Sequence, residues 1–90
     1  MLFAWMGFLK SSDPIDQPLQ QQISGFLEQP YIAIESAGVL RDEGGGRAGY
    51  LVLFEAESRA AAEALVAESP IRRAGLYSEY HLFEYQAEVG

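Results

Sequence analysis

The sequence predicts an α+β fold in which four strands and two helices follow one another in the order β-α-β-β-α-β. Three observations lead to this prediction: apolar segments without a helical period, two segments with a helical apolar face, and turn residues between them. The chain has 90 residues, of which 49% are hydrophobic and 21% charged, as in a globular protein. We therefore expect one domain that spans residues 1–90.

The first expected pair of elements is a strand followed by a helix. Met1–Leu9 is apolar and aromatic, which is typical of a strand that is buried on both faces. After a turn at Ser11–Pro14, Asp16 is a good N-cap, and Pro18 then falls in the first helical turn, where its missing N–H costs no hydrogen bond. The helix should end before Pro30. Its apolar face consists of Leu19, Ile23, Phe26 and Leu27.

A β-hairpin is expected in the middle of the chain. Its two strands are Tyr31–Leu40 and Tyr50–Glu55, and Ser36–Gly38 indicates a bend or bulge in the first of them. Gly44–Gly46 forms the tip of the hairpin. Because this glycine run lacks the Lys-Ser/Thr of a phosphate-binding loop and follows two acidic residues, we interpret it as a turn.

The last expected pair is an alanine-rich helix and a long strand. Ser58 is the N-cap of this helix, and Ser69-Pro70 ends it. Ile71–Ala74 makes one more turn, and Gly75 permits the reversal into a strand at Leu76–Gln86. The side of the helix expected to face the sheet consists of Ala61, Ala64, Leu65 and Glu68.

This order of elements is the ferredoxin-like arrangement, with one antiparallel sheet. Two helices can cover only one face of a four-stranded sheet, yet the expected strands are apolar on both sides. If the side chains of the last strand alternate strictly, one face carries Tyr77, Phe83 and Tyr85, and the other carries Leu76, Tyr80 and Leu82. A bare apolar face of that size needs a partner, so we expect a homodimer whose two sheets face each other in a dimeric α/β barrel.

The composition argues against several classes of function. With 6 basic and 13 acidic residues the net charge is −7, which disfavours binding to nucleic acid and to anionic membranes. The chain has no cysteine, which excludes disulfides, thiolate metal sites and cysteine nucleophiles. Met1–Leu9 is too short to span a bilayer and lacks a basic start, so we expect a cytoplasmic protein.

Several segments of the second half follow one another in a recognisable order. They are Ala37–Asp42, Gly49, Glu55–Ser58, Ser69-Pro70, Ala74–Tyr77 and Glu84–Gly90. In this order they resemble the YciI-like (YCII-related) family of dimeric α/β-barrel proteins, and the similarity covers about residues 38 to 90. The resemblance implies a ferredoxin-like fold, a homodimer and a pocket between the two facing sheets.

The resemblance also implies where catalytic residues would lie. Some members of the family are suspected enzymes that use a His on the first helix and an Asp in an Asp-Pro pair after the second. This chain has Gln20–Gln22 in the first region and Ser69-Pro70 in the second. Neither glutamine nor serine exchanges protons near pH 7 as those residues do, so the resemblance does not extend to this catalytic pair.

The only histidine, His81, is the single candidate for proton transfer, with Glu79 or Glu35 as its acidic partner. A histidine on a strand that faces solvent or the dimer contact is the simpler interpretation. One histidine without cysteine does not make a metal site. We expect no metal and no cofactor.

Other candidates could contact a ligand. The aromatic residues of the strands could line a pocket for a flat apolar molecule, or simply fill the core or an interface. They are Trp5, Tyr50, Tyr77, Tyr80, Phe83 and Tyr85. Arg41 and Asp42 could orient a polar ligand at the mouth of the barrel, or form an ion pair within the hairpin. Arg72 and Arg73 could bind an anion, or pair with Glu68 and the carbonyl groups at the helix end.

We therefore expect a small homodimer that binds a small, partly aromatic molecule between the facing sheets, or that acts as an accessory protein. Two alternatives stay open: a cofactor-free isomerase or lyase acting on an aromatic-derived substrate, and a purely structural protein-interaction module. A titratable group inside the cavity would favour the enzyme. A cavity of aromatic and aliphatic side chains would favour binding.

Overall fold

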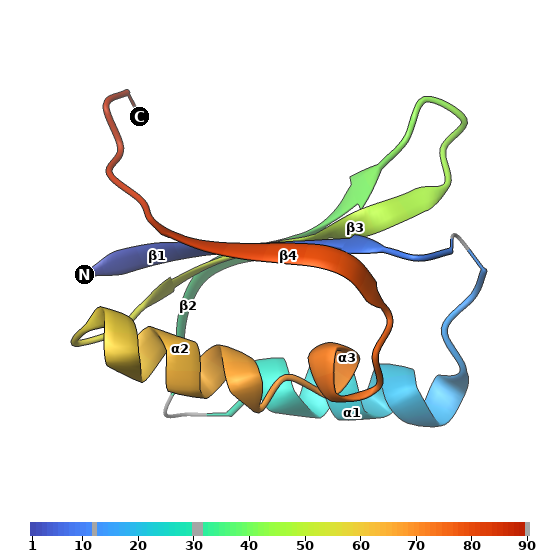
Figure 1. Ribbon diagram of the computed structural model, residues 1–90, viewed down its shortest axis with the longest axis horizontal. Helices are drawn as coiled ribbons and strands as arrows, with labels where there is room; N and C mark the ends of the chain where they lie inside the picture. The colour runs from blue at the N-terminus through green and yellow to red at the C-terminus, as the bar shows by residue number, and fades with distance from the viewer. Residues whose placement is uncertain (12, 30–31, 90) are drawn as a thin grey trace.

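The computed structural model describes residues 1–11, 13–29 and 32–89, and its elements follow the predicted order (Figure 1). The strands are β1 (Leu2–Leu9), β2 (Ala33–Arg41), β3 (Arg47–Glu55) and β4 (Tyr77–Glu84). The helices are α1 (Gln17–Leu27), α2 (Arg59–Ala67) and the single turn α3 (Pro70–Arg73). All strand pairs are antiparallel, in the order β2-β3-β1-β4, which is the ferredoxin-like α+β fold. Ser12 of the expected turn, Pro30 after the expected first helix, and Tyr31 at the expected start of the second strand lie outside the described residues.

The three helices lie on one side of the sheet, which we call the helix-side face (Figure 1). This face holds the core, a cluster made of Phe3, Trp5, Phe54, Ala62, Val66, Ile71 and Tyr77. No helix in the described ranges is long and apolar enough to cross a membrane.

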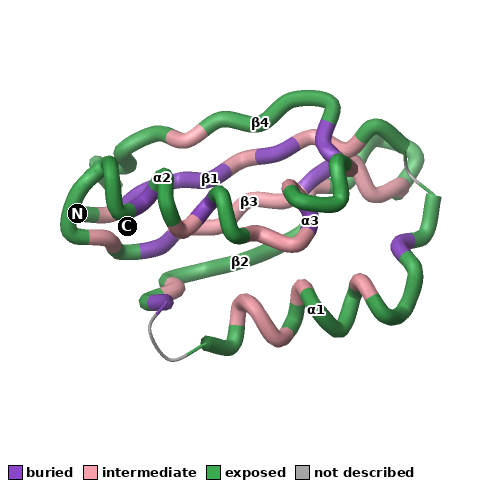
Figure 2. Tube along the Cα trace, turned by 60° about the horizontal axis from the view of Figure 1, so that its bottom comes forward, coloured by how far each residue is buried: buried purple, intermediate pink, exposed green. Residues whose placement is uncertain are grey.

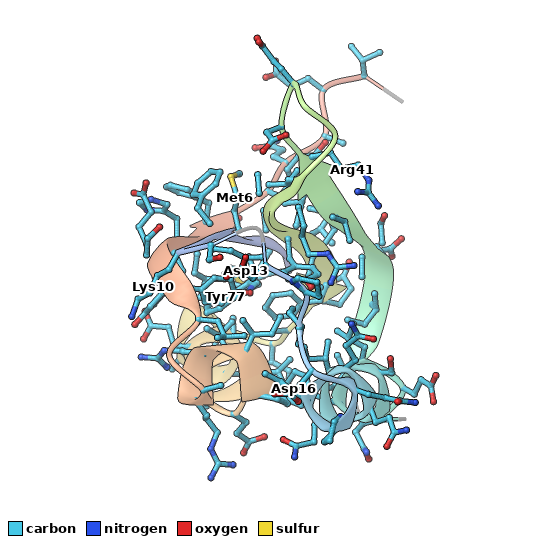
Figure 3. The ribbon with its side chains drawn as sticks, turned by 90° about the vertical axis from the view of Figure 1, so that its right-hand side faces the viewer. Met6, Lys10, Asp13, Asp16, Arg41 and Tyr77 are labelled. Carbon is cyan, nitrogen blue, oxygen red and sulfur yellow. The ribbon has the colours of Figure 1, made fainter. Side chains whose placement is uncertain are left out.

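The opposite side of the sheet, which we call the open face, is covered by none of these helices (Figure 1). The ladder from β3 through β1 to β4 places one row of residues there: Leu51, Leu53, Ala4, Met6, His81 and Phe83. Figure 3 shows Met6 pointing away from the helices and Tyr77 pointing toward them. The open face is therefore largely apolar, and Phe83 is 54% exposed.

Local chemistry at the helix ends agrees with the sequence-based expectations. The backbone N–H of Leu19 donates to Oδ1 of Asp16 at 2.9 Å, and the N–H of Ala61 donates to Oγ of Ser58 at 3.1 Å, so both N-caps are confirmed. Gly75 follows α3 with a φ of 71°, a left-handed conformation that permits the reversal into β4.

The buried side of α2 differs from the expectation. Ala62 and Val66 are buried, whereas Ala61 and Ala64 are exposed, so the predicted face is wrong by one residue. Alanine occurs all round this helix, and the sequence therefore gives little contrast between its sides. The two large apolar side chains of the helix, Leu65 and Val66, both pack against the core, so the buried side includes Val66 as well as the expected Leu65.

β4 contains a bulge at Ser78, whose hydroxyl donates to the backbone carbonyl of Phe8 at 3.1 Å. A bulge adds one residue to a strand and reverses the alternation of faces beyond it. Tyr77 therefore shares the helix-side face with Tyr80. The prediction that Tyr77 lies on the same face as Phe83, which assumed strict alternation, is therefore wrong.

The hairpin between β2 and β3 is longer than expected, because β3 begins at Arg47 instead of Tyr50. Gly45 adopts a φ of 82° at the tip, which confirms the glycine turn. The register of β2 shifts between Ile34 and Ser36, so its bulge lies at Glu35, one residue before the predicted segment.

Candidate functional site

A cavity of about 190 Å³ lies between the helix-side face of the sheet and the helices. Its sheet wall includes Trp5, Tyr50, Val52 and Tyr77, and its helix wall includes Ile23, Phe26, Leu65 and Ile71. A dry cavity of roughly 150 Å³ can hold a benzene molecule, so this volume suits a ligand with one ring. The lining residues Ala37 and Val39 of β2 are exposed, which places the mouth of the cavity beside this strand.

The cavity exists because α1 does not pack closely against the sheet. Helices with an apolar stripe normally bury that stripe against a core. In α1 no residue is buried, and Ile23, Phe26 and Leu27 reach only intermediate burial (Figure 2). These three side chains line the cavity, and the space between them and β3 is left unfilled.

The polar side-chain groups of the described lining residues are the indole N–H of Trp5 and the hydroxyls of Tyr50, Tyr77 and Ser69. The Tyr77 hydroxyl accepts a hydrogen bond from Nε1 of Trp5 at 3.2 Å. Burial raises the pKa of Tyr77 above 10.0, and the hydrogen bond from Trp5 only partly opposes this shift. Tyr77 is therefore a neutral phenol near pH 7. The described lining contains no carboxylate and no histidine that could accept a proton.

Two of the predicted ligand contacts lie together. The rings of Trp5 and Tyr80 stack with centroids 5.3 Å apart, and Trp5 is 4% exposed. Trp5 lines the cavity, whereas Tyr80 lies outside the lining and is partly exposed. Nε of Arg72 donates to the Tyr80 hydroxyl at 3.1 Å, and its guanidinium lies 5.0 Å from the ring centroid. This contact replaces the expected ion pair between Arg72 and a helix acid.

His81 lies on the open face, on the opposite side of the sheet from the cavity. Its Nε2 is 3.1 Å from Oε2 of Glu79, so Glu79 is the acidic partner in place of Glu35. The imidazole also stacks on Phe83, with ring centroids 5.8 Å apart. In this position His81 cannot reach a ligand in the cavity, and a role between two copies of the chain stays a prediction.

Arg41 and Asp42 stabilise the tip of the hairpin. Nη1 of Arg41 donates to the carbonyl of Gly45 at 3.0 Å, and Oδ1 of Asp42 accepts from the N–H of Gly46 at 2.8 Å. Arg41 lies beside the hairpin in Figure 3. The expected ion pair between the two side chains is wrong, since the glycine turn offers each of them a backbone partner.

Tyr50 and Tyr77, two of the aromatic residues that the sequence offered as possible pocket residues, line the cavity, whereas sequence reasoning missed Arg47. Nη1 of Arg47 donates to the Tyr50 hydroxyl at 2.9 Å, and the guanidinium lies 5.6 Å from the Tyr50 ring centroid. Arg47 was expected in the loop, because the strand was expected to begin at Tyr50. Tyr77 was assigned to the other face because alternation alone does not reveal the bulge at Ser78.

Comparisons with known proteins support the fold. The sequence matches no protein-family model, and no curated protein matches it. A similar solved structure is 5-chloro-2-hydroxyhydroquinone dehydrochlorinase (TftG) from Burkholderia phenoliruptrix AC1100, in complex with 2,5-dihydroxybenzoquinone. The two chains are 21% identical, the match covers 96% of this chain and 94% of that chain, and the TM-score is 0.69. At this identity the likeness shows that the two proteins share a fold.

Proposed function

We propose that the protein binds a small, partly aromatic molecule in the cavity between the sheet and α1. The observation that carries this proposal is the lining itself, which combines the rings of Trp5, Tyr50 and Tyr77 with aliphatic side chains. Ligand sites are typically concave and apolar, with few polar groups. This cavity lies within one chain, on the other side of the sheet from the inter-sheet space expected from the sequence.

The volume and the fold similarity support a ligand with one ring. The cavity of about 190 Å³ is close in size to cavities that hold benzene. The structurally similar dehydrochlorinase was solved with 2,5-dihydroxybenzoquinone, a molecule built on a single six-membered ring. We therefore take hydroxylated six-membered rings as the first probes for this chain.

The alternative function is a cofactor-free lyase or isomerase. The activity in the name of the similar protein, a dehydrochlorinase, favours it. The lining weighs against it, because a reaction of this kind needs a group that takes up a proton near pH 7. The lining hydroxyls, of which Tyr77 has a raised pKa, do not supply one.

We further propose that the protein is a YciI-like homodimer located in the cytoplasm. The fold shared with the dehydrochlorinase supports the family. The dimer is supported by the open face, where Met6, Leu51, Leu53 and Phe83 lack the cover that helices give to the other side. The absence of cysteine is compatible with a reducing compartment.

The binding proposal is tested through the fluorescence of Trp5, which is the only tryptophan and lines the cavity. Titration with hydroxybenzenes and hydroxybenzoquinones should give a saturable change in emission. Ala37→Leu should weaken binding at least roughly tenfold, because the larger side chain occupies the mouth of the cavity.

Ala33→Leu is the matched control, since Ala33 lies on the same strand but pairs with Glu55 on the other face. This variant should bind like the wild type. If the folded wild type shows no saturable response to any of these probes, the binding proposal is wrong. If the wild type converts a probe into a product, the alternative function, an enzyme, is correct.

A further inference from the structure

An arginine lies next to the mouth of the cavity. In the ladder between β2 and β3, the exposed lining residue Val39 pairs with Tyr50. Tyr50 lines the cavity wall, and its hydroxyl accepts the hydrogen bond from Nη1 of Arg47 at 2.9 Å. The guanidinium is therefore one hydrogen bond away from the cavity lining.

Arg47 has no acidic partner in the part of the chain that the structure describes. The ion pairs found there within 4.0 Å join the N-terminus to Glu55, Arg59 to Glu63, and His81 to Glu79. Asp42, in the same hairpin, uses its carboxylate for the N–H of Gly46. A half-buried arginine without a carboxylate partner is unexpected in a chain that contains 13 acidic residues.

The polar groups at this end of the cavity are hydrogen-bond donors. Guanidinium has five N–H groups and no acceptor, and the contact with Tyr50 occupies one of them. The Tyr50 oxygen accepts from Arg47, which leaves the tyrosine its own O–H to donate. Tyr77 is in the same situation, because its oxygen accepts from Trp5 and its raised pKa keeps the proton in place.

A set of donors that includes a positive charge selects a negatively charged oxygen. Hydrogen bonds from a guanidinium to an anion are shorter and stronger than those between neutral groups. The net charge of −7 opposes anion binding in general. Distant surface charges are screened over about 8 Å at physiological ionic strength, however, so the adjacent Arg47 dominates the local field.

Resting on the proposed function, we propose that the ligand is an anionic ring compound. Its ring enters the apolar cavity beside Trp5, and its charged oxygen accepts hydrogen bonds from Arg47 and Tyr50 at the mouth. The chemical class is that of aromatic carboxylates and deprotonated hydroxyquinones. In this arrangement the lining provides affinity for the ring, and Arg47 determines the preference for charge.

The test compares benzoate with benzyl alcohol, two probes of similar size of which only the first is charged. Both titrations are followed by Trp5 fluorescence. Wild type should bind benzoate at least roughly tenfold more tightly, as expected for a charge-assisted hydrogen bond. Arg47→Gln should weaken benzoate binding roughly 10- to 100-fold and change benzyl alcohol binding less than about twofold. Arg47→Lys should restore part of the preference.

Arg41→Gln is the control, because Arg41 pairs with Arg47 across the ladder and its loss changes the net charge equally. It should leave both affinities within about twofold of wild type, since Arg41 contacts the hairpin tip. Equal affinity of wild type for the two probes, or equal losses for both in Arg47→Gln, overturns this inference and leaves cavity binding intact. If no single-ring probe binds the folded wild type, both proposals fall.

Discussion

Tyr77 depends on a glycine in the neighbouring strand. A β-carbon at Gly7 would overlap the Tyr77 ring, so only glycine lets this ring lie against β1. From this position the Tyr77 hydroxyl accepts the indole N–H of Trp5, and the two rings meet edge to face with centroids 5.8 Å apart. This hydrogen bond gives the buried indole N–H an acceptor. It also holds the rings of Trp5 and Tyr77, which both line the cavity, in a fixed position.

The raised pKa of Tyr77 predicts a loss of stability in alkali. Burial favours the neutral phenol, so from pH 10 upward the unfolded chain releases this proton before the folded chain does. The folded state then holds more protons, and the free energy of unfolding falls as the pH rises from 10.0 through the raised pKa. Urea unfolding of wild type across this range should show the decrease.

Tyr77→Phe is the control for this titration, since it removes the ionising group. Below pH 10 the phenol is protonated in both states, and this contribution is constant. Above pH 10 the variant should lose less stability per pH unit than wild type. Identical slopes for the two proteins would show that Tyr77 does not contribute.

For individual residues, the sequence predicts those contacts whose partners lie a few positions away along the chain. The caps at Asp16 and Ser58 and the reversal at Gly75 depend on neighbouring backbone, and all three are confirmed. The bond between Arg47 and Tyr50 spans only three residues, but it required knowing that β3 already begins at Arg47. Neither residue type nor spacing indicated this.

Among the helices, α1 has the weakest packing. It has a good N-cap and an apolar side, yet none of its residues is fully buried. Its stability therefore depends more on intrinsic helix preference than that of α2, which buries Ala62 and Val66. This makes α1 sensitive to a residue such as Gly25 in its interior.

Replacing Gly25 with alanine should stabilise the protein. Glycine in a helix interior costs about 0.5–1 kcal/mol relative to alanine, and a β-carbon at Gly25 would meet no atom within 4 Å. The free energy of unfolding in urea should rise by about this amount. Gly45→Ala is the contrast, because its φ of 82° is strained for alanine and stability should fall. A loss of stability in Gly25→Ala would contradict this account of α1.

Strand faces were predictable only where the ladder is regular. β1, which was expected to be buried on both faces, pairs with β3 without a shift in register and buries consecutive residues at Phe3, Ala4 and Trp5. In β2 and β4 the bulges at Glu35 and Ser78 shift the pattern. Since a bulge is determined by pairing with the neighbouring strand, a single strand read by itself does not disclose it.

The whole molecule has one covered and one uncovered side of its sheet. The sequence predicted this asymmetry, because it indicates only two long helices beside four strands that are apolar on both sides. The cavity could not be predicted in this way. It results from the distance between α1 and the sheet, which depends on how the side chains of both fill the space between them.

We expect the chain to sediment as a homodimer at micromolar concentration, because the apolar open face is covered by pairing. Leu53→Glu should shift the equilibrium to monomer, since it places a charge in the middle of that face. Ala61→Glu adds the same charge on the exposed side of α2 and should leave the dimer intact. A wild-type species of 9.9 kDa would contradict the dimer.

The bulge at Ser78 also determines how this strand tolerates a deletion. Without Ser78 the strand would alternate strictly, and with Tyr77 held over Gly7 the residues from Glu79 to Phe83 would keep the faces that they have now. Tyr80 would still stack on Trp5, and His81 and Phe83 would still lie on the open face. The loss of this single codon would thus straighten the strand and leave both of its surfaces unchanged.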